Sequence, residues 1–262
     1  MEYNGTVQNY SNKVTLREQT DFAEQPVESH KEMQDFIIDC IEHTKLNVIG
    51  NNKDGVGWQK VFPKTAKELF FNKTVTCSFI PIIYIIQQIH FTSISIQNIK
   101  TALWKGYQDI FINEAVEKYV YSILRKQGKS AFMDKIKKKQ ANFETILISD
   151  DYYITDLDWW VFCTTAQLPV VLFSSTSLKT FSPTLDWIRL GGKSVNQKHF
   201  FIRSPSKIIT NVPPGYHLIQ NGYDFKQLNT DKFTKAAIGD SEYVNNMQSI
   251  GEFLSKDTVV RR

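Results

Sequence analysis

Cys77 stands at the start of the apolar segment CSFIPIIYII, directly after the polar stretch NKTVT. Proline is tolerated only in the first turn of a helix, so Pro81 predicts a helix that begins close to Cys77. The positive end of the helix dipole would lower the pKa of this thiol and favour a nucleophilic thiolate. The backbone N–H groups of Thr74, Val75 and Thr76 would lie beside it as an oxyanion loop. The alternative is a packed core thiol.

A thiol nucleophile needs an imidazole base from a distant part of the chain. His217 follows a Pro-Pro-Gly turn and opens the short strand HLIQ, a rigid position from which to aim a side chain. His199, at the start of HFFIR, is the rival. If the register of the last strand slips by one residue, Tyr216 takes the place of the histidine and the site has no base. A third side chain, which would orient the imidazole, could come from Asn211, Gln220 or Asn221, or be absent.

Composition narrows the class of protein. The chain has 262 residues, 42% of them hydrophobic, and a net charge of +4, which gives no electrostatic footprint for nucleic acid. Its three cysteines are odd in number and lack paired spacing, which argues against a disulfide scaffold and for a reducing compartment. The five histidines are scattered, and we expect neither a metal nor another cofactor.

The two ends of the sequence and its apolar runs bear on location. The first 30 residues are polar and lack the apolar core of a signal peptide. The longest apolar run is too short to span a bilayer. We therefore expect a protein of the cytoplasm without a membrane partner. Three segments are expected: a polar N-terminal segment at 1–30, a folded domain at 31–225, and a polar tail with a weak helix at 226–262.

Helical patterns dominate the first two thirds of the domain. Cys40 falls on the apolar stripe of a helix around Met33–Ile41 and is expected to be buried. Helices are also predicted for PKTAKELFF, for the stretch after the N-cap Ser95, and on both sides of Gly128. Thr155 and Asp158 resemble a capping box. The helix that follows includes Cys163, which we expect to be buried and unreactive.

Strand patterns dominate the last third. The apolar run LPVVLFSS, which includes Pro169, predicts a central strand over about 169–173. KHFFIRS and GYHLIQ are shorter strands, separated by a proline-containing loop. Helices followed by strands predict an α+β fold, with several helices packed on a small mixed sheet.

The order of these segments resembles the ovarian-tumour (OTU) family of cysteine proteases, over about residues 70–222. CSFIPIIYIIQQ followed by IQNIKTALWKGYQ is similar to the nucleophile helix and the next helix of that family. ISDDYYITDLDWWVFCTTAQLPVVLFSS is similar to its later helix and central strand, and GYHLI falls where its histidine strand lies. The likeness is greatest to OTU-like domains encoded by large eukaryotic DNA viruses. It implies a papain-like, OTU-like fold with Cys77 as nucleophile and His217 as base.

Two functions follow from this resemblance. The first is a cysteine isopeptidase, a deubiquitinase-like hydrolase that releases ubiquitin or a ubiquitin-like protein from lysine without a cofactor. The second is a catalytically inactive OTU-like binding or assembly module of a viral protein, in the host cytoplasm or the virion. Residues 74–76 read Thr-Val-Thr where the family has Asp-Gly-x, and Ile219 fills the slot of its Asp or Asn; both departures favour the second. A protease acting on viral precursors is a third possibility.

Overall fold

The computed structural model describes residues 40, 66–90, 92–111, 113–173, 187–190, 199–205 and 207–221. The domain boundaries expected near residues 30 and 225, most of the helix expected around Met33–Ile41, and the weak C-terminal helix lie outside these residues. The helical elements are a 3₁₀ turn, η2 (Thr76–Ser78), and six α-helices: α3 (Ile80–His90), α4 (Ile96–Ile110), α5 (Glu114–Lys126), α6 (Ser130–Lys137), α7 (Phe143–Ile148) and α8 (Asp156–Ala166). The strands are β1 (Ala66–Phe70), β2 (Val170–Phe173), β3 (Trp187–Leu190), β4 (Phe200–Arg203) and β5 (His217–Asn221).

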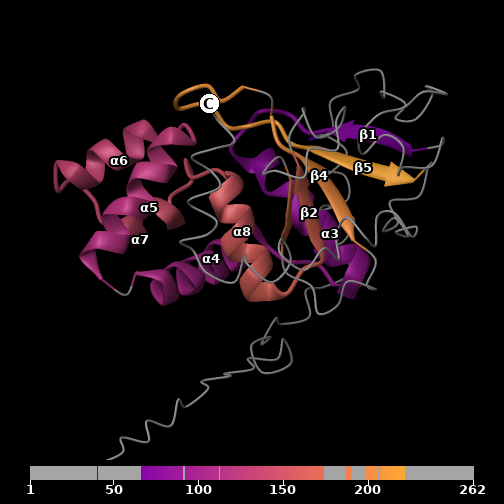
Figure 1. The fold of residues 1–262 in the computed structure, drawn as a ribbon, viewed down its shortest axis with the longest axis horizontal. Helices are drawn as coiled ribbons and strands as arrows, with labels where there is room; N and C mark the ends of the chain where they lie inside the picture. Colours follow the sequence, from indigo (N-terminus) through magenta and orange to yellow (C-terminus); the bar gives the residue numbers. More distant parts are fainter. Residues whose placement is uncertain are drawn as a thin grey trace, which may run out of the picture.

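The described residues form an α+β fold with a small mixed sheet, which confirms the predicted class. The strand order is β1-β5-β4-β2-β3, and every neighbouring pair is antiparallel except β2 and β4. In Figure 1, α5, α6 and α7 gather at one end and the sheet lies at the other, with α4 and α8 between them. The predicted central strand is confirmed as β2. Among the described residues, α7 and β3 are elements that the sequence patterns did not predict.

The helix predicted for PKTAKELFF is wrong, because residues 66–70 of that stretch form strand β1. Ala, Lys, Glu and Leu are good helix formers, so local propensity favours a helix here. The strand forms because β1 pairs antiparallel with β5, with Phe70 opposite His217 and Glu68 opposite Ile219. This pairing joins segments about 150 residues apart, so nothing in the local pattern indicates it.

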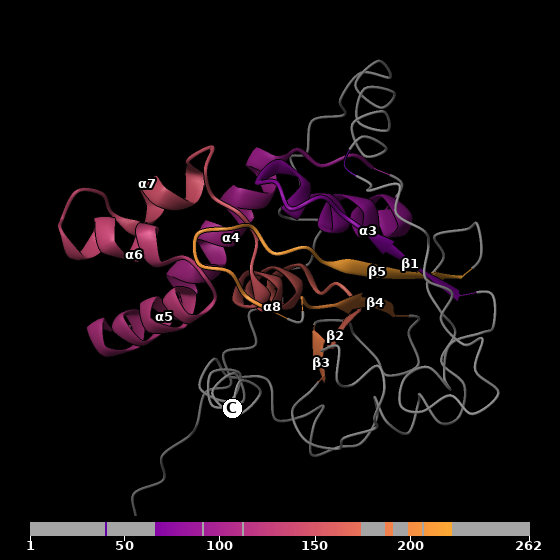
Figure 2. The same cartoon turned by 90° about the horizontal axis from the view of Figure 1, so that it is seen from above.

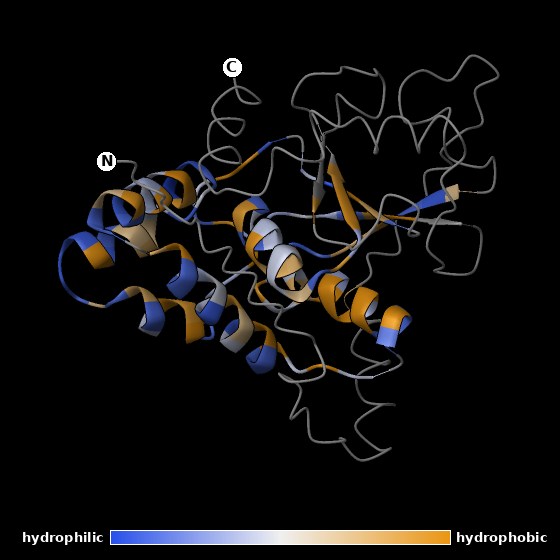
Figure 3. Ribbon diagram, turned by 60° about the horizontal axis from the view of Figure 1, so that its bottom comes forward, coloured by the Kyte–Doolittle hydropathy of each residue, from blue (hydrophilic) through white to orange (hydrophobic). Residues whose placement is uncertain are grey.

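Two helices are buried on all sides and form the centre of the core. Seven successive residues of α3, from Ile80 to Ile86, are buried, and so are seven of α8, from Leu157 to Cys163. Figure 3 shows α3 as the most uniformly hydrophobic helix, and Figure 2 shows it beside β1 and β5. A helix that is hydrophobic all round belongs in an interior. Helix α4 crosses α8 closely, since a Cβ at Gly106 would lie 2.6 Å from Val161 Cγ1.

Local signals located the helix ends well. The Ser95 hydroxyl accepts a hydrogen bond from the Asn98 N–H at 3.1 Å and caps α4. The predicted capping box between Thr155 and Asp158 is present at the start of α8. Gly128 separates α5 from α6 with a φ of +97°, a conformation that favours glycine. All three predictions are confirmed.

The Asp158 carboxylate is the most heavily bonded polar group among the described residues. It accepts hydrogen bonds from the hydroxyls of Tyr107 (2.7 Å) and Tyr152 (2.6 Å), and from the hydroxyl and N–H of Thr155 (2.8 and 2.7 Å). It also pairs with Lys129 Nζ at 2.5 Å, and neither side chain of this ion pair is exposed. Burial lowers the pKa of Lys129 to about 8, although the carboxylate opposes this effect. Asp158 therefore ties α4, the α5–α6 junction and α8 together.

We predict that Asp158→Asn destabilises the protein by about 3–5 kcal/mol, because it leaves the buried Lys129 ammonium without a countercharge. Urea denaturation of the full chain measures this change. The matched control is Asp134→Asn, which breaks a half-exposed pair with Arg125 at 2.7 Å and should leave the free energy of unfolding nearly unchanged. Equal stability of the two variants would contradict a central role for the buried pair.

Candidate functional site

Cys77 lies where the sequence placed it but not in the predicted state. It is the middle residue of η2, and α3 begins three residues later at Ile80, so Pro81 does fall in the first turn of α3. Its side chain is only 6% exposed, as in the alternative of a packed core residue. It forms a disulfide with Cys40, at a sequence separation of 37 residues. A sulfur in a disulfide is not a thiolate, so Cys77 is no nucleophile in this state.

The prediction of three separate thiols is therefore wrong for Cys40 and Cys77, although Cys40 is buried as expected. Sequence spacing does not show this pairing, since the fold brings the two residues together. A backbone hydrogen bond also links this region, because the Asn72 N–H donates to the Cys40 carbonyl at 2.9 Å. Cys163 is a free, fully buried cysteine, and burial raises the pKa of its thiol well above the usual value. Its predicted inertness agrees with that environment.

Oxygen atoms of the loop before Cys77 accept hydrogen bonds from the N–H groups of η2. The Cys77 N–H donates to the Thr74 hydroxyl at 3.2 Å, and the Ser78 N–H to the carbonyls of Thr74 and Val75 at 3.2 Å. The Ser78 hydroxyl accepts from the Ile154 N–H at 3.0 Å, which ties this turn to the segment before α8. The N–H of Cys77, which would be a natural oxyanion donor, is therefore already engaged in the loop.

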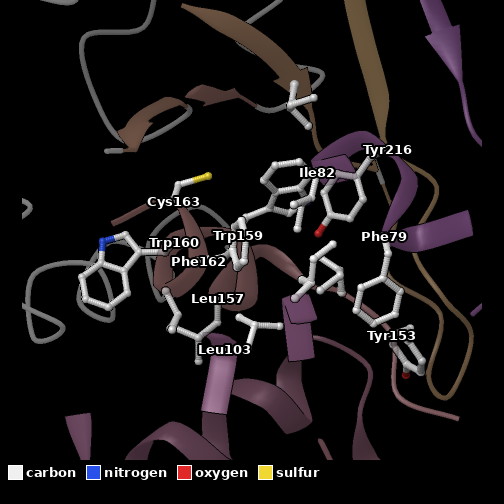
Figure 4. Close-up of a cluster of buried hydrophobic side chains, with 14 of the residues drawn as sticks. Phe79, Ile82, Leu103, Tyr153, Leu157, Trp159, Trp160, Phe162, Cys163 and Tyr216 are labelled. Carbon is white, nitrogen blue, oxygen red and sulfur yellow. The ribbon is translucent and has the colours of Figure 1, made fainter. Parts of the chain in front are cut away.

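His217 projects from the face of the sheet opposite to the one that packs on the hydrophobic cluster of Cys77. Side chains alternate along a strand, so Tyr216 and Leu218 point to one face and His217 to the other. Tyr216 and Leu218 belong to the same hydrophobic cluster as Cys77. Figure 4 shows Tyr216 in this cluster, where its ring meets Trp159 edge-on, with centroids 5.7 Å apart. The expected pairing of Cys77 with His217 is wrong for this structure, and Tyr216 occupies the register position on the core side.

The His217 imidazole belongs to a charged network on its own face. Arg203 Nη2 donates to His217 Nδ1 at 2.9 Å and to Glu68 Oε2 at 3.1 Å, and Arg203 Nε donates to Glu68 Oε1. Because a guanidinium only donates, Nδ1 accepts and the neutral imidazole carries its proton on Nε2. Phe70 stacks obliquely on the ring, with centroids 4.7 Å apart. Burial, followed by the charges of Arg203 and Lys73, lowers the pKa of His217 to about 3.

The remaining candidates have structural roles. His199 directly precedes β4 and is fully buried. Asn211 adopts a left-handed conformation, with φ 59°, and its side chain accepts from the Ala131 N–H at 2.8 Å. Ile219 is buried on the face of β5 that carries His217. Glu68 and Arg203 were missed by the sequence analysis; Arg203 was the single charge in an otherwise apolar strand, and Glu68 was read as part of a helix.

Two further observations concern ligands and membranes. Within the described ranges, no three His, Cys, Asp or Glu side chains are grouped to hold a metal ion. In the same part of the chain, each helix is too short or too polar to cross a bilayer. Comparisons of the chain with protein-family models, curated proteins and solved structures give no match.

The state of the thiols gives a direct test. We predict that alkylation of the denatured, unreduced protein labels one cysteine, Cys163, and that prior reduction raises the number to three, because Cys40 and Cys77 are joined. Intact-mass spectrometry counts the labels, and peptide mapping assigns them. The control is Cys40→Ser, in which Cys77 should react without reduction. Three labels on the unreduced wild type would show that the bond is absent.

His217 predicts a pH dependence of stability. Its folded pKa of about 3 lies below the usual 6.5, so the unfolded chain binds the proton more readily between these values. Stability from this residue is complete above pH 6.5 and is lost as the pH falls towards 3. We expect His217→Gln, which keeps an acceptor for Arg203 without titrating, to lose less stability over this range. The wild type should lose on the order of 2 kcal/mol more stability than the variant. This is less than the full pKa shift of His217 would give, because the imidazole is partly exposed.

Urea denaturation at a series of pH values between 3 and 7 measures the stability of both proteins. The carboxylates contribute to both curves, so their contributions cancel in the difference. Parallel curves for the wild type and His217→Gln would contradict the assigned environment of this imidazole.

Proposed function

We propose that this chain is a non-catalytic binding module with an OTU-like layout, whose partner is ubiquitin or a ubiquitin-like protein. The layout is supported by the order of elements: a helix after Cys77, a helical region from α4 to α7, then α8 and the central strand β2, and a last strand that begins at His217. The partner rests on the resemblance of the sequence alone. A role in the assembly of a viral protein is the corresponding biological setting.

One observation carries the non-catalytic assignment. His217 projects from one face of the sheet, whereas Cys77 belongs to the hydrophobic cluster on the other face, and each has its own partner, Cys40 for Cys77 and Arg203 for His217. Thiol proteolysis needs the imidazole within hydrogen-bonding reach of the sulfur, so that one proton passes between them. Reduction of the disulfide would release the thiol but would not move His217 through the sheet. On the core side, the phenol of Tyr216 donates to Asp156 Oδ1 at 2.7 Å and is a poor substitute for an imidazole base.

The isopeptidase remains the second candidate because of the position of Cys77. It precedes an α-helix of 11 residues, and the positive end of that helix would stabilise a thiolate once the disulfide is reduced. A thiolate without an imidazole can attack a strong electrophile, but it lacks a group to protonate the leaving amine.

The experiment that separates the two functions uses ubiquitin with an electrophile at its C-terminus. We predict no covalent adduct by intact-mass spectrometry, with or without a reductant, because the thiol has no base and its loop has no free Cys77 N–H to offer. Cys77→Ala controls for labelling at other residues. An adduct that forms after reduction, and disappears in both Cys77→Ala and His217→Ala, would overturn the proposal in favour of the isopeptidase.

Binding is measured separately, by titrating isotopically labelled ubiquitin with the reduced and unreduced protein. Absence of any shift would overturn the proposed partner.

A further inference from the structure

A small cavity lies beneath the proline-containing segment at residues 207–215, which we call the strap. The cavity measures about 20 Å³, room for one water molecule or one oxygen-bearing group. Besides the strap, its lining includes Lys73, Gln127 and Pro205. Among these described lining residues there is no acidic side chain, whereas Lys73 and Lys207 both carry positive charge. Neither Cys77 nor His217 lines the cavity, although Lys73, which does, also contributes to the lowered pKa of His217.

The strap is fixed on the α5–α6 junction by bonds from one residue. The Asn211 N–H donates to the Gly128 carbonyl at 2.6 Å, and the Asn211 side chain accepts from the Ala131 N–H at 2.8 Å. The Gly128 carbonyl also accepts from the Tyr153 hydroxyl at 3.0 Å. A Cβ at Gly128 would lie 3.0 Å from the Ile209 carbonyl, so the contact is close. These contacts place the strap beside the cavity.

Gln127 is a buried donor without an acceptor. Its side chain is 2% exposed, and its Oε1 accepts from the Leu157 N–H at 3.0 Å, which fixes the orientation of the amide. Its Nε2 group is buried and has no hydrogen-bond partner among the described residues. An unpaired buried donor is unfavourable, and an incoming oxygen that accepts from it would remove this cost. Because Nε2 is covered, a ligand reaches it by a small outward shift of the strap.

The outer rim of the cavity is apolar. Ile209 is 49% exposed and Val212 is 36% exposed, and both belong to the few large hydrophobic residues exposed in the described part of the chain. Both also line the cavity. We propose that this cavity binds a carboxylate that has an apolar side chain beside it, as at the end of a peptide or next to an acidic residue within one. Gln127 Nε2 donates to the carboxylate, Lys73 and Lys207 balance its charge, and the rim holds the apolar neighbour.

This site goes beyond the proposed function, because it involves neither Cys77 nor His217 and assumes no particular protein as partner. Its ligand is defined by one donor, two cations and an apolar rim. The probes are small acids and amides, so a negative result here leaves the ubiquitin experiment unaffected, and the reverse also holds.

The test is a titration of the isotopically labelled full chain followed by NMR. The probes are N-acetyl-leucine, its amide N-acetyl-leucinamide, and N-acetyl-glutamyl-leucinamide. We expect the side-chain amide signals of Gln127 to move with the two acids and not with N-acetyl-leucinamide. Stronger binding of N-acetyl-leucine would indicate a C-terminal carboxylate as the natural ligand, and stronger binding of the glutamyl probe an acidic side chain. Both outcomes support the site; equal shifts with the neutral amide, or none with either acid, overturn it.

Variants locate the site. Lys207→Ala should weaken the binding of the acids about twofold to fivefold, the range for one exposed charge. The matched control is Lys105→Ala, which removes an exposed lysine from α4 and should leave binding unchanged. Gln127→Glu keeps an acceptor for the Leu157 N–H but replaces the donor with a negative oxygen, so binding should be lost. If that variant does not fold, the two lysine variants decide: equal affinities for Lys207→Ala and Lys105→Ala overturn the proposal.

Discussion

The buried pair of Lys129 and Asp158 is the interaction on which the arrangement of the helices depends. Two charges removed from water are tolerated only when each is closely bonded, and this requirement fixes every group that surrounds the carboxylate. Asp158 lies in the first turn of α8, so its partners determine where that helix begins and which way it points. The segment just before α8 is then held against the turn around Cys77 through Ile154 and Ser78. A polar contact in the helical half thus positions the start of the central helix α3.

The alternation of side chains along β5 separates the two chemical features that the sequence suggested. Residues of strand β5 that face the helices join an apolar core, and those of the opposite face join a network of Glu68, Arg203 and His217. A shift of one residue in pairing would exchange these two environments completely. The register places His217 between two cross-strand partners, Phe70 on β1 and Arg203 on β4. Residue types that are common in catalysis are used here for packing and for ion pairing.

The sequence predicted features that depend on neighbouring residues and missed those that depend on distant ones. The caps at Ser95 and at Thr155 were found because a cap is defined within four residues. The apolar run of β2 was recognised because a central strand is apolar on both faces. Strand β1 was mistaken for a helix, because its pairing with β5 overrides local propensity. The disulfide of Cys77 and the face of His217 were missed for the same reason: each is set by tertiary pairing.

The bond between Cys40 and Cys77 closes a covalent ring, and β1 lies within it. Closing a ring of this size removes conformational freedom from the unfolded chain, a stabilisation of about 4 kcal/mol in the chain-entropy view. β1 is also the edge strand of the sheet, the position from which a strand most readily exchanges with that of another molecule. Here the edge strand is tethered at both ends to the start of α3, on one side by the backbone and on the other by sulfur. Strand exchange between two copies would have to carry the whole closed loop across, so the disulfide opposes this route to entangled dimers.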